Sequence, residues 1–135
     1  MRGYLHALED AQIPRDEELV QLGDFKEASG YEAMNALLNN VNDLTAVFVT
    51  SFQMTYGAMR AINERGLYYK KEIALMGFDI TDSKSLMSSG ITSVIQPERS
   101  IGMTAVNSLL SRIENHSDVN HNIILDYSIV ERQST

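Results

Sequence analysis

The sequence contains no cysteine and no tryptophan, and only two of its 135 residues are proline. The absence of thiols excludes disulfides and thiolate zinc sites. It is typical of a reducing compartment, although exported domains without cysteine also exist. No apolar run approaches the ~20 residues that a membrane-spanning helix needs. The N-terminal stretch MRGYLHALEDA is amphipathic and acidic, unlike a secretory signal. We therefore expect a cytoplasmic protein with no membrane contact.

Basic side chains are scarce as well. Eleven lysines and arginines stand against 18 acidic residues, so the formal net charge is −7. A surface that grips phosphates needs an excess of positive charge, so this chain is not expected to bind nucleic acid directly. Its hydrophobic fraction of 44% is that of a globular protein, and its length predicts one domain.

Several chemical signatures are also missing. The glycines form no G-x-G-x-x-G after a strand, and there is no Walker loop to hold a nucleotide. His6, His116 and His121 are far apart on polar segments, which favours surface positions over metal ligands. Ser100, Ser108 and Ser111 have no nearby base to activate them. We therefore predict no metal, no cofactor and no enzymatic activity.

The clearest structural pattern lies between Thr45 and Asp79. Residues 46–49 and 73–76 are short apolar runs, which predict strands buried on both faces. Between them, residues 53–65 repeat at helical spacing, and a glycine follows as a stop. Two buried strands joined by a helix indicate parallel pairing with a right-handed crossover.

The rest of the chain continues this alternation. Helices are expected at residues 2–11, 30–39 and 99–113, and further strands at 18–22, 91–95 and 123–130, with a break at Asp126 and a polar tail at 131–135. Ser29 is the expected N-cap of the second helix. Residues 80–90 are weakly patterned, with a possible short helix. The fold class is therefore an open, mostly parallel α/β sheet with helices on both faces. Because the chain begins on a helix, we expect a preceding segment of the same fold.

Three segments follow predicted strands and so belong at one edge of the sheet, where small molecules bind in this class. They are Gly23–Phe25, Thr50–Phe52 and Gly77–Asp79. Together they supply carboxylates, hydroxyls and aromatic rings, which suit a carbohydrate or a purine base. The alternative is that the same polar residues only cap helices and form turns. Phe78 alternates with its strand and is expected in the core.

A second surface is predicted on the helix at residues 53–65. Tyr56, Met59 and Asn63 lie opposite the stripe that should face the sheet. Leu86 and Met87 add further apolar candidates. These residues predict a self-association surface, although scattered exposed apolar residues are normal.

Several ordered motifs resemble the effector-binding region of LacI/GalR-family transcription regulators. They are GYLHALEDAQIP, GDFKEASGYEAMNALL, TAVFVTSFQMTYGAMRAINERGL, EIALMGFD, ITSVIQP, IGMTAVNSLLSRI and VERQST. The resemblance implies a periplasmic-binding-protein-like core of type I, with a small effector between two lobes and a helix-turn-helix headpiece upstream. It implies that residues 1–92 and 123–135 form the C-terminal lobe. Residues 93–122 would cross the hinge and supply a helix to the N-terminal lobe.

The resemblance also assigns residues. Asp79 matches the aspartate that commonly accepts hydrogen bonds from effector hydroxyls, and Phe25 falls where some members stack a ring. Ser51 and Phe52 replace a frequent Asn-Asp pair beside the site, and Gln96 lies at the hinge crossing near the cleft. Two further departures are Ile80, where the family has a second acid, and Gly90, where it has a proline. The family's effector-binding arginine would lie upstream of Met1.

Tyr56 and Met87 match positions that commonly contribute to the dimer interface. The function implied is the effector-binding and dimerising part of a homodimeric regulator that senses a sugar or sugar phosphate and reaches operator DNA through the headpiece. The alternative is one lobe of an exported sugar-binding transport protein, and a small α/β enzyme would need a catalytic group that the sequence lacks.

Overall fold

A computed structural model of the chain describes residues 1–81, 90–115 and 122–135. Its elements, in chain order, are α1 (Arg2–Asp10), η1 (Glu17–Leu19), α2 (Glu27–Asn40), β1 (Ala46–Phe48), α3 (Phe52–Glu64), β2 (Ala74–Phe78), β3 (Thr92–Ile95), α4 (Glu98–Asn115) and β4 (Ser128–Val130). The four predicted helices are present with ends shifted by a few residues at most. The possible short helix within residues 80–90 lies largely outside the described residues.

The strands form one sheet in the order β1-β2-β3-β4. β1, β2 and β3 run parallel, with Phe48 beside Met76 and Phe78 beside Val94. β4 is antiparallel to β3. The expectation of an open, mostly parallel sheet is therefore confirmed.

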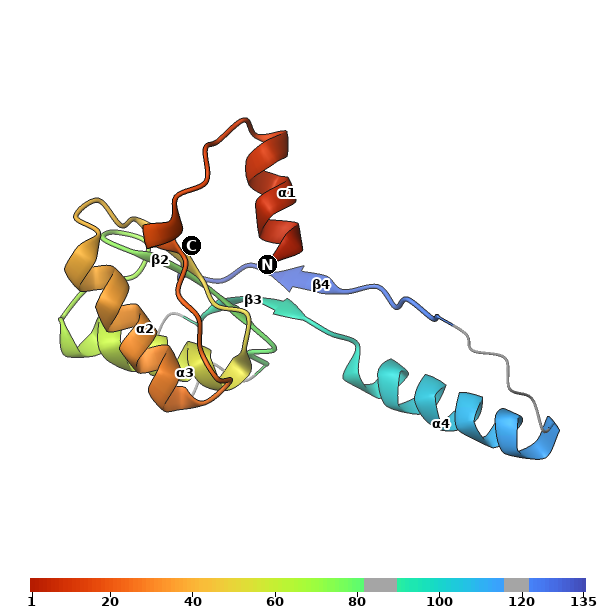
Figure 1. Ribbon diagram of the computed structural model, residues 1–135. Helices are drawn as coiled ribbons and strands as arrows, with labels where there is room; N and C mark the ends of the chain where they lie inside the picture. The colour runs from red at the N-terminus through yellow and green to blue at the C-terminus, as the bar shows by residue number, and fades with distance from the viewer. Residues whose placement is uncertain (82–89, 116–121) are drawn as a thin grey trace.

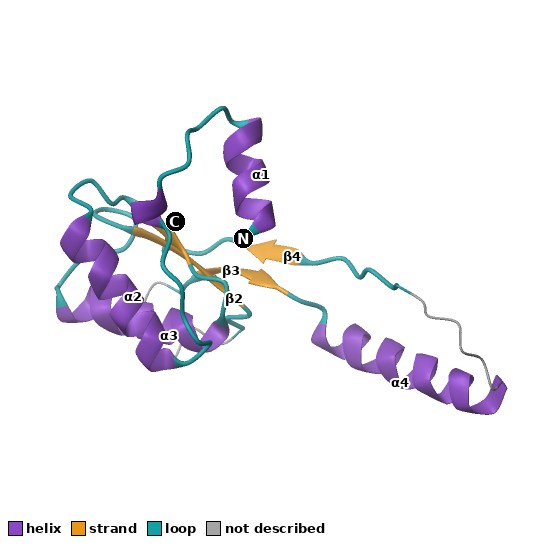
Figure 2. Ribbon diagram, viewed as in Figure 1, coloured by secondary structure: helices purple, strands orange, loops and turns teal. Residues whose placement is uncertain are grey.

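Helices α2 and α3 lie together on one face of this sheet (Figure 2). Along β2, Leu75 and Gly77 are buried beneath α3, and an added Cβ at Gly77 would overlap Thr55 of that helix. The two helices themselves touch at glycines. An added Cβ at Gly30 of α2 would overlap the backbone of Met54, and one at Gly57 of α3 would overlap the backbone of Glu27. Glycine at both positions is what allows this close approach.

The opposite face of the sheet is less buried than expected. Met76 and Phe78 alternate with the buried residues of β2 and are only half-buried, so Phe78 is not in the core as expected. Helix α4 extends away from the sheet, and α1 stands apart from the pair formed by α2 and α3 (Figure 1). The two faces of the sheet therefore differ. Helices α2 and α3 cover one face, whereas the other face is apolar and accessible.

The strand predicted at residues 18–22 is wrong. Residues 17–19 instead form the 3-10 turn η1, and Leu22 is 84% exposed. The cause is local, because the side chain of Asp16 accepts a hydrogen bond of 2.9 Å from the amide of Glu18. Such a side-chain bond gives the backbone an alternative to a strand ladder. Val20 keeps an extended conformation after this turn.

The last strand is shorter than predicted, since residues 123–125 are irregular and only Ser128–Val130 pair with β3. The tail beyond it does not simply run into solvent. Ser134 is fully buried, its carbonyl accepts from the amide of Leu75 at 3.0 Å, and its hydroxyl donates to the carbonyl of Leu75 at 2.6 Å. The same hydroxyl accepts from the amide of Thr92 at 2.8 Å. The end of the chain thus ties β2 to β3 at the start of their pairing.

Candidate functional site

The carboxyl ends of β1 and β2 come together as predicted. The amide of Val49 donates to the carbonyl of Met76 at 2.9 Å, so the segments after these strands start side by side. The amide of Asp79 donates to the carbonyl of Val94 at 2.8 Å, which brings in the end of β3 as well. Ser51 and Asp79 therefore belong to one rim of the sheet.

Asp79 is held from several directions. Its φ angle is +55°, in the left-handed region that non-glycine residues rarely occupy. One carboxylate oxygen, Oδ1, accepts from the backbone amide of Gln96 at 2.9 Å, and Oδ2 accepts from the Gln96 side-chain amide at 2.7 Å. The next amide, of Ile80, donates to the hydroxyl of Ser93 at 3.0 Å. Asp79 and Gln96, each predicted separately as an effector residue, are thus in direct contact.

Ser51 and Phe52 begin α3. Ser51 is the N-cap residue and is 8% exposed, but its hydroxyl makes no capping hydrogen bond. The helix start is satisfied instead through its carbonyl, which accepts from the amide and from the hydroxyl of Thr55. Phe52 is 45% exposed, and its ring meets that of Tyr56 edge-on at a centroid distance of 4.9 Å. Ser51 is therefore not the simple helix cap of the alternative interpretation.

Phe25 lies on a loop that approaches the start of α3. Its φ is +66° and it is 70% exposed. Two residues earlier, an added Cβ at Gly23 would overlap the side chain of Met54 in α3. Phe25 and Asp79 are thus both in the left-handed conformation, which is often retained at binding sites because the surrounding structure enforces it.

The Asp24 side chain, by contrast, is used within its own loop. It accepts a hydrogen bond of 3.0 Å from the amide of Lys26. Hydrogen bonding to Ser29 and to the Lys26 amide lowers the pKa of the Asp24 carboxyl from its ordinary value. Lys26, not Ser29, is the N-cap residue of α2, and the Ser29 hydroxyl accepts from the amide of Asp24 at 3.1 Å. For Asp24 the turn-forming interpretation holds, and the prediction of Ser29 as the N-cap is wrong.

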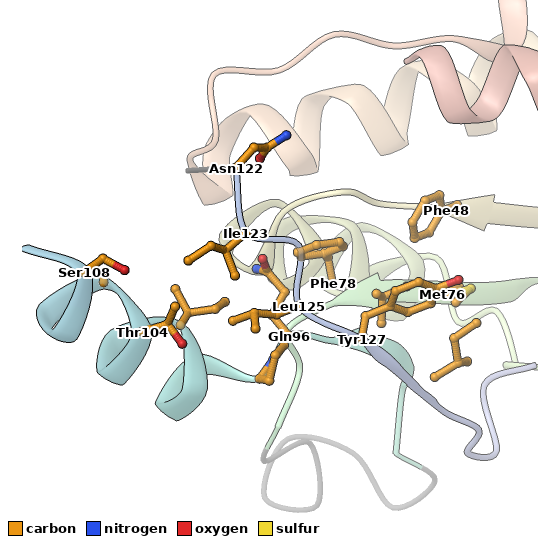
Figure 3. A pocket seen from close by; sticks show the side chains of 15 residues that line it. Phe48, Met76, Phe78, Gln96, Thr104, Ser108, Asn122, Ile123, Leu125 and Tyr127 are labelled. Atoms are coloured by element: carbon orange, nitrogen blue, oxygen red, sulfur yellow. The ribbon is translucent and has the colours of Figure 1, made fainter. Parts of the chain in front are cut away.

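The second face of the sheet borders an open hollow of about 920 Å³ (Figure 3). We call it the sheet hollow. It is lined by Phe48, Met76, Phe78, Val94, Gln96, Pro97, Ile101, Thr104, Ala105, Ser108, Asn122, Ile123, Leu125, Tyr127 and Ile129. In Figure 3 Thr104 and Ser108 project from α4, whereas Phe48 and Met76 project from the strands. Of the five predicted effector residues only Gln96 lines this hollow, so Gln96 is where the rim and the hollow meet.

Sequence reasoning missed most of the sheet hollow. Besides side chains of the strands, its walls come from α4 and from residues 122–127, and no local pattern places these two segments beside the sheet. The usable signal was the strong apolar stripe of α4. In the structure that stripe stays exposed, with Leu109 at 60% and Ile113 at 62%.

The predicted self-association residues have different environments. Met59 was expected on an outer face, and this is wrong: it is 4% exposed and belongs to the core. The reason is that α3 packs against α2 as well as against the sheet, so its buried surface is wider than one stripe. Tyr56 is half-buried against the core. Met87 lies outside the described residues.

Two negative findings concern the described residues only. None of the helices in that part of the chain has the length and apolar character to cross a membrane. Over the same ranges, no cluster of three or more histidine or acidic side chains is arranged to hold a metal ion.

In open α/β sheets, small molecules bind at the rim where neighbouring strands end, and this chain has a polar and aromatic rim of that kind. The whole chain, residues 1–135, matches the family described as periplasmic binding protein-like domain, and it belongs to that family. Its similarity to regulators of the LacI type extends over essentially its full length.

Three relatives illustrate this. The HTH-type transcriptional repressor PurR of Photorhabdus laumondii is 38% identical over 133 residues, which are 98% of this chain and 39% of the repressor. The structure of the transcriptional regulator CelR–cellobiose complex aligns with a TM-score of 0.90 and 32% identity, over 98% of this chain and 41% of that one. The LacI family transcriptional regulator from Enterococcus faecium with bound ribose aligns with a TM-score of 0.86 and 26% identity, over 98% and 49%. This chain thus spans less than half the length of each.

Proposed function

We propose that this chain is the C-terminal lobe and hinge crossing of the effector-binding domain of a LacI/GalR-type transcription regulator. The observation that carries the proposal is the rim of the sheet, where Asp79 and Gln96 are in direct contact and where the strand ends before Ser51 and Asp79 lie side by side. Regulator names among the relatives favour this function over the alternative of an exported transport protein.

The effector we propose is a sugar or sugar phosphate. An ionised carboxylate only accepts hydrogen bonds, so Asp79 selects a ligand rich in hydroxyl donors. The exposed rings of Phe25 and Phe52 offer flat apolar faces to the C–H side of such a ligand. Ser51 adds a hydroxyl that its helix does not use for capping. Relatives with bound cellobiose and ribose support the same ligand class.

The effector acts through a difference in affinity. A ligand that contacts both lobes binds the closed arrangement better than the open one and so shifts the population toward it. In a homodimer this shift changes the spacing of two DNA-binding headpieces. That coupling is a free energy shared by the effector and the operator.

The division of the chain follows from the same proposal. Residues 1–92 and 123–135 belong to the C-terminal lobe, and residues 93–122 cross the hinge and supply α4 to the other lobe. The exposed apolar side chains of α4 support this, because large contiguous apolar patches are uncommon on a free surface. A structure of the complete regulator tests it: α4 packed on this chain's own sheet would contradict the division.

Operator DNA would be contacted only by a headpiece outside this chain, in the cytoplasm. The net charge of −7 supports that separation. Binding to duplex DNA, measured at several salt concentrations, should be absent for this chain and present for the complete regulator. Salt-dependent binding by the chain alone would contradict it.

The experiment for the site is Asp79→Ala in the complete regulator. The effector concentration for half-maximal operator release should rise by about tenfold or more, since hydrogen bonds to a charged group contribute about 1.5–3 kcal/mol. Operator affinity without effector is measured in parallel, so that a changed arrangement of the lobes is separated from a loss of effector binding. Asp43→Ala, which removes an exposed carboxylate from a turn, is the matched control. An unaltered effector response in Asp79→Ala would refute the site.

A further inference from the structure

Gln96 satisfies both oxygens of the Asp79 carboxylate. Its backbone amide reaches Oδ1 at 2.9 Å and its side-chain Nε2 reaches Oδ2 at 2.7 Å. Gln96 therefore donates two hydrogen bonds to one carboxylate, one to each oxygen. A carboxylate has about four acceptor positions, so one position on each oxygen is left for another donor.

The backbone of Asp79 is bound to β3 as well. Its amide donates to Val94, and the following amide of Ile80 donates to the buried Ser93 hydroxyl. The left-handed φ of Asp79 costs free energy in isolation and persists only where surrounding bonds enforce it. The carboxylate thus has little freedom to turn away from Gln96.

Gln96 in turn lies at the start of the connection to α4. Its carbonyl accepts from the amide of Glu98 at 2.9 Å, and the carbonyl of Pro97 accepts from the amide of Ile101 at 2.9 Å. Proline fixes its own φ, so the two residues between β3 and α4 have few conformations. The direction in which α4 leaves the sheet therefore depends on how Gln96 is held.

We propose that Gln96 is a positioning residue that fixes the Asp79 carboxylate and the direction of α4 through the same two hydrogen bonds. Because Nε2 faces the carboxylate, the amide oxygen of Gln96 points away from it as an acceptor. Asp79 and Gln96 together thus present acceptors to a ligand with several hydroxyl donors. Only this last step rests on the proposed function: a ligand that binds Asp79 would then act on the hinge crossing directly.

The test measures the direction of α4 in the chain itself, without effector or DNA. Spin labels are placed at Glu32→Cys in α2 and Asn107→Cys in α4, two exposed positions. The chain has no cysteine of its own, so only these sites are labelled. Pulsed electron paramagnetic resonance then gives the distribution of distances between them. The unmodified pair should give one narrow distance, and Gln96→Met, which has no donor on its side chain, should lose it.

A second variant separates positioning from a general loss of structure. In Gln96→Glu the introduced carboxylate repels that of Asp79 at pH 8, so the distribution should be broad. Two adjacent carboxyls raise the pKa of one of them, and the protonated form can donate to Asp79. The narrow distance should therefore return near pH 5 in Gln96→Glu, while Gln96→Met stays broad at both pH values.

The outcomes are decisive in both directions. A narrow distance in Gln96→Met, or a pH-independent distribution in Gln96→Glu, overturns the inference. Far-UV circular dichroism of each variant shows whether it is folded. The distance distributions of Gln96→Glu at the two pH values are compared with each other, so that comparison needs no second protein as a reference. Failure of the proposed effector response in Asp79→Ala leaves this result untouched, so the two proposals fail separately.

Discussion

The ionisation of Tyr69 departs far from its ordinary value. Partial burial raises the pKa of its phenol to about 12. Its hydroxyl lies 3.5 Å from the carbonyl of Met59 and 3.4 Å from the Asn63 side chain, both at the outer limit of a hydrogen bond. Burial of the ring, and not a charged partner, therefore controls its protonation.

We expect the free energy of unfolding to fall between about pH 10 and pH 12. The unfolded chain loses the Tyr69 proton near pH 10 and the folded chain only near pH 12, so folding takes up a proton within this window. This stabilising contribution is complete below pH 10 and is lost as pH rises through the folded pKa. Denaturant unfolding at a series of pH values measures the slope.

In Tyr69→Phe the free energy of unfolding should fall less steeply with pH between about pH 10 and pH 12. Tyr31 titrates in the same direction, because its hydrogen bond to Glu64 raises its pKa. Tyr31→Phe is therefore the comparison that separates the two contributions. A slope in Tyr69→Phe identical to that of the unchanged chain would contradict the assignment.

Ser134 shows how a single hydroxyl in the tail serves the sheet. It donates to Leu75 and accepts from Thr92, and all three lie in the buried interior. Ser134→Ala leaves a carbonyl and an amide without their partner, which should lower the free energy of unfolding by about 1–3 kcal/mol. Urea denaturation provides the measurement. The neighbouring exposed Gln133→Ala is the control and should change stability little; an equal loss in both would show that the tail acts by bulk alone.

At the scale of the elements, the contact between α2 and α3 depends on Gly57 and Gly30. Gly57→Ala forces a methyl group against the backbone of Glu27, which cannot move without shifting α2. We expect a loss of about 1–3 kcal/mol from overpacking. Thermal unfolding followed by circular dichroism measures it.

Gly102→Ala is the matched control for that prediction. Gly102 lies in α4 with no neighbouring atom within 4 Å of an added Cβ. Because alanine favours a helix over glycine by about 1 kcal/mol, this variant should be neutral or slightly more stable. If Gly57→Ala lowers the free energy of unfolding while Gly102→Ala leaves it unchanged or raises it, the contact with α2, and not helix propensity, controls Gly57. A loss of stability in both variants, or a gain in both, would refute this explanation.

Elements also differ in how well the sequence predicted them. The strand at residues 46–49 and the helix at 53–65 lie close to where they were predicted, since an apolar run and a helical period each leave a clear local pattern. The expectation that this strand is buried on both faces is wrong, because Phe48 is 50% exposed. The strand at residues 18–22 was not, because one Asp16 side chain redirected the backbone. Met59 was placed on the wrong face of α3, because periodicity gives one buried stripe and cannot anticipate a second packed helix.

For the whole molecule, the self-association surface is the main open prediction. We propose a homodimer that uses α3 near Tyr56, with Met87 as a further candidate and Met59 removed from the surface by its burial. Tyr56→Lys in the complete regulator should shift the sedimentation coefficient from dimer to monomer. The reason is that a charge buried in an interface is costly without a partner.

Lys71→Ala, on an exposed loop, is the control for that experiment and should remain dimeric. A dimeric mass for Tyr56→Lys at low micromolar concentration would place the interface elsewhere. Circular dichroism of both variants shows whether the substitution has disturbed the fold itself, since Tyr56 also packs against Phe52.

Some features of the candidate site could be predicted from the sequence and others could not, for a physical reason. The placement of Asp79 and Ser51 at one rim follows from parallel pairing, which the lengths and composition of the strands already implied. The direct bonds from Gln96 to Asp79 could not be derived, because the two residues are 17 positions apart and meet only through the pairing of β2 with β3. The sheet hollow needed the position of α4, which no local pattern contains.

The sequence by itself determined the alternation of strands and helices, the mostly parallel sheet and the chemical types at its rim, because each depends on residues close together in the chain. Only the tertiary structure decided that the tail joins β2 to β3, that Met59 is buried and that Gln96 holds Asp79. These features arise from contacts between distant segments, whose geometry is set by the packing of the whole fold.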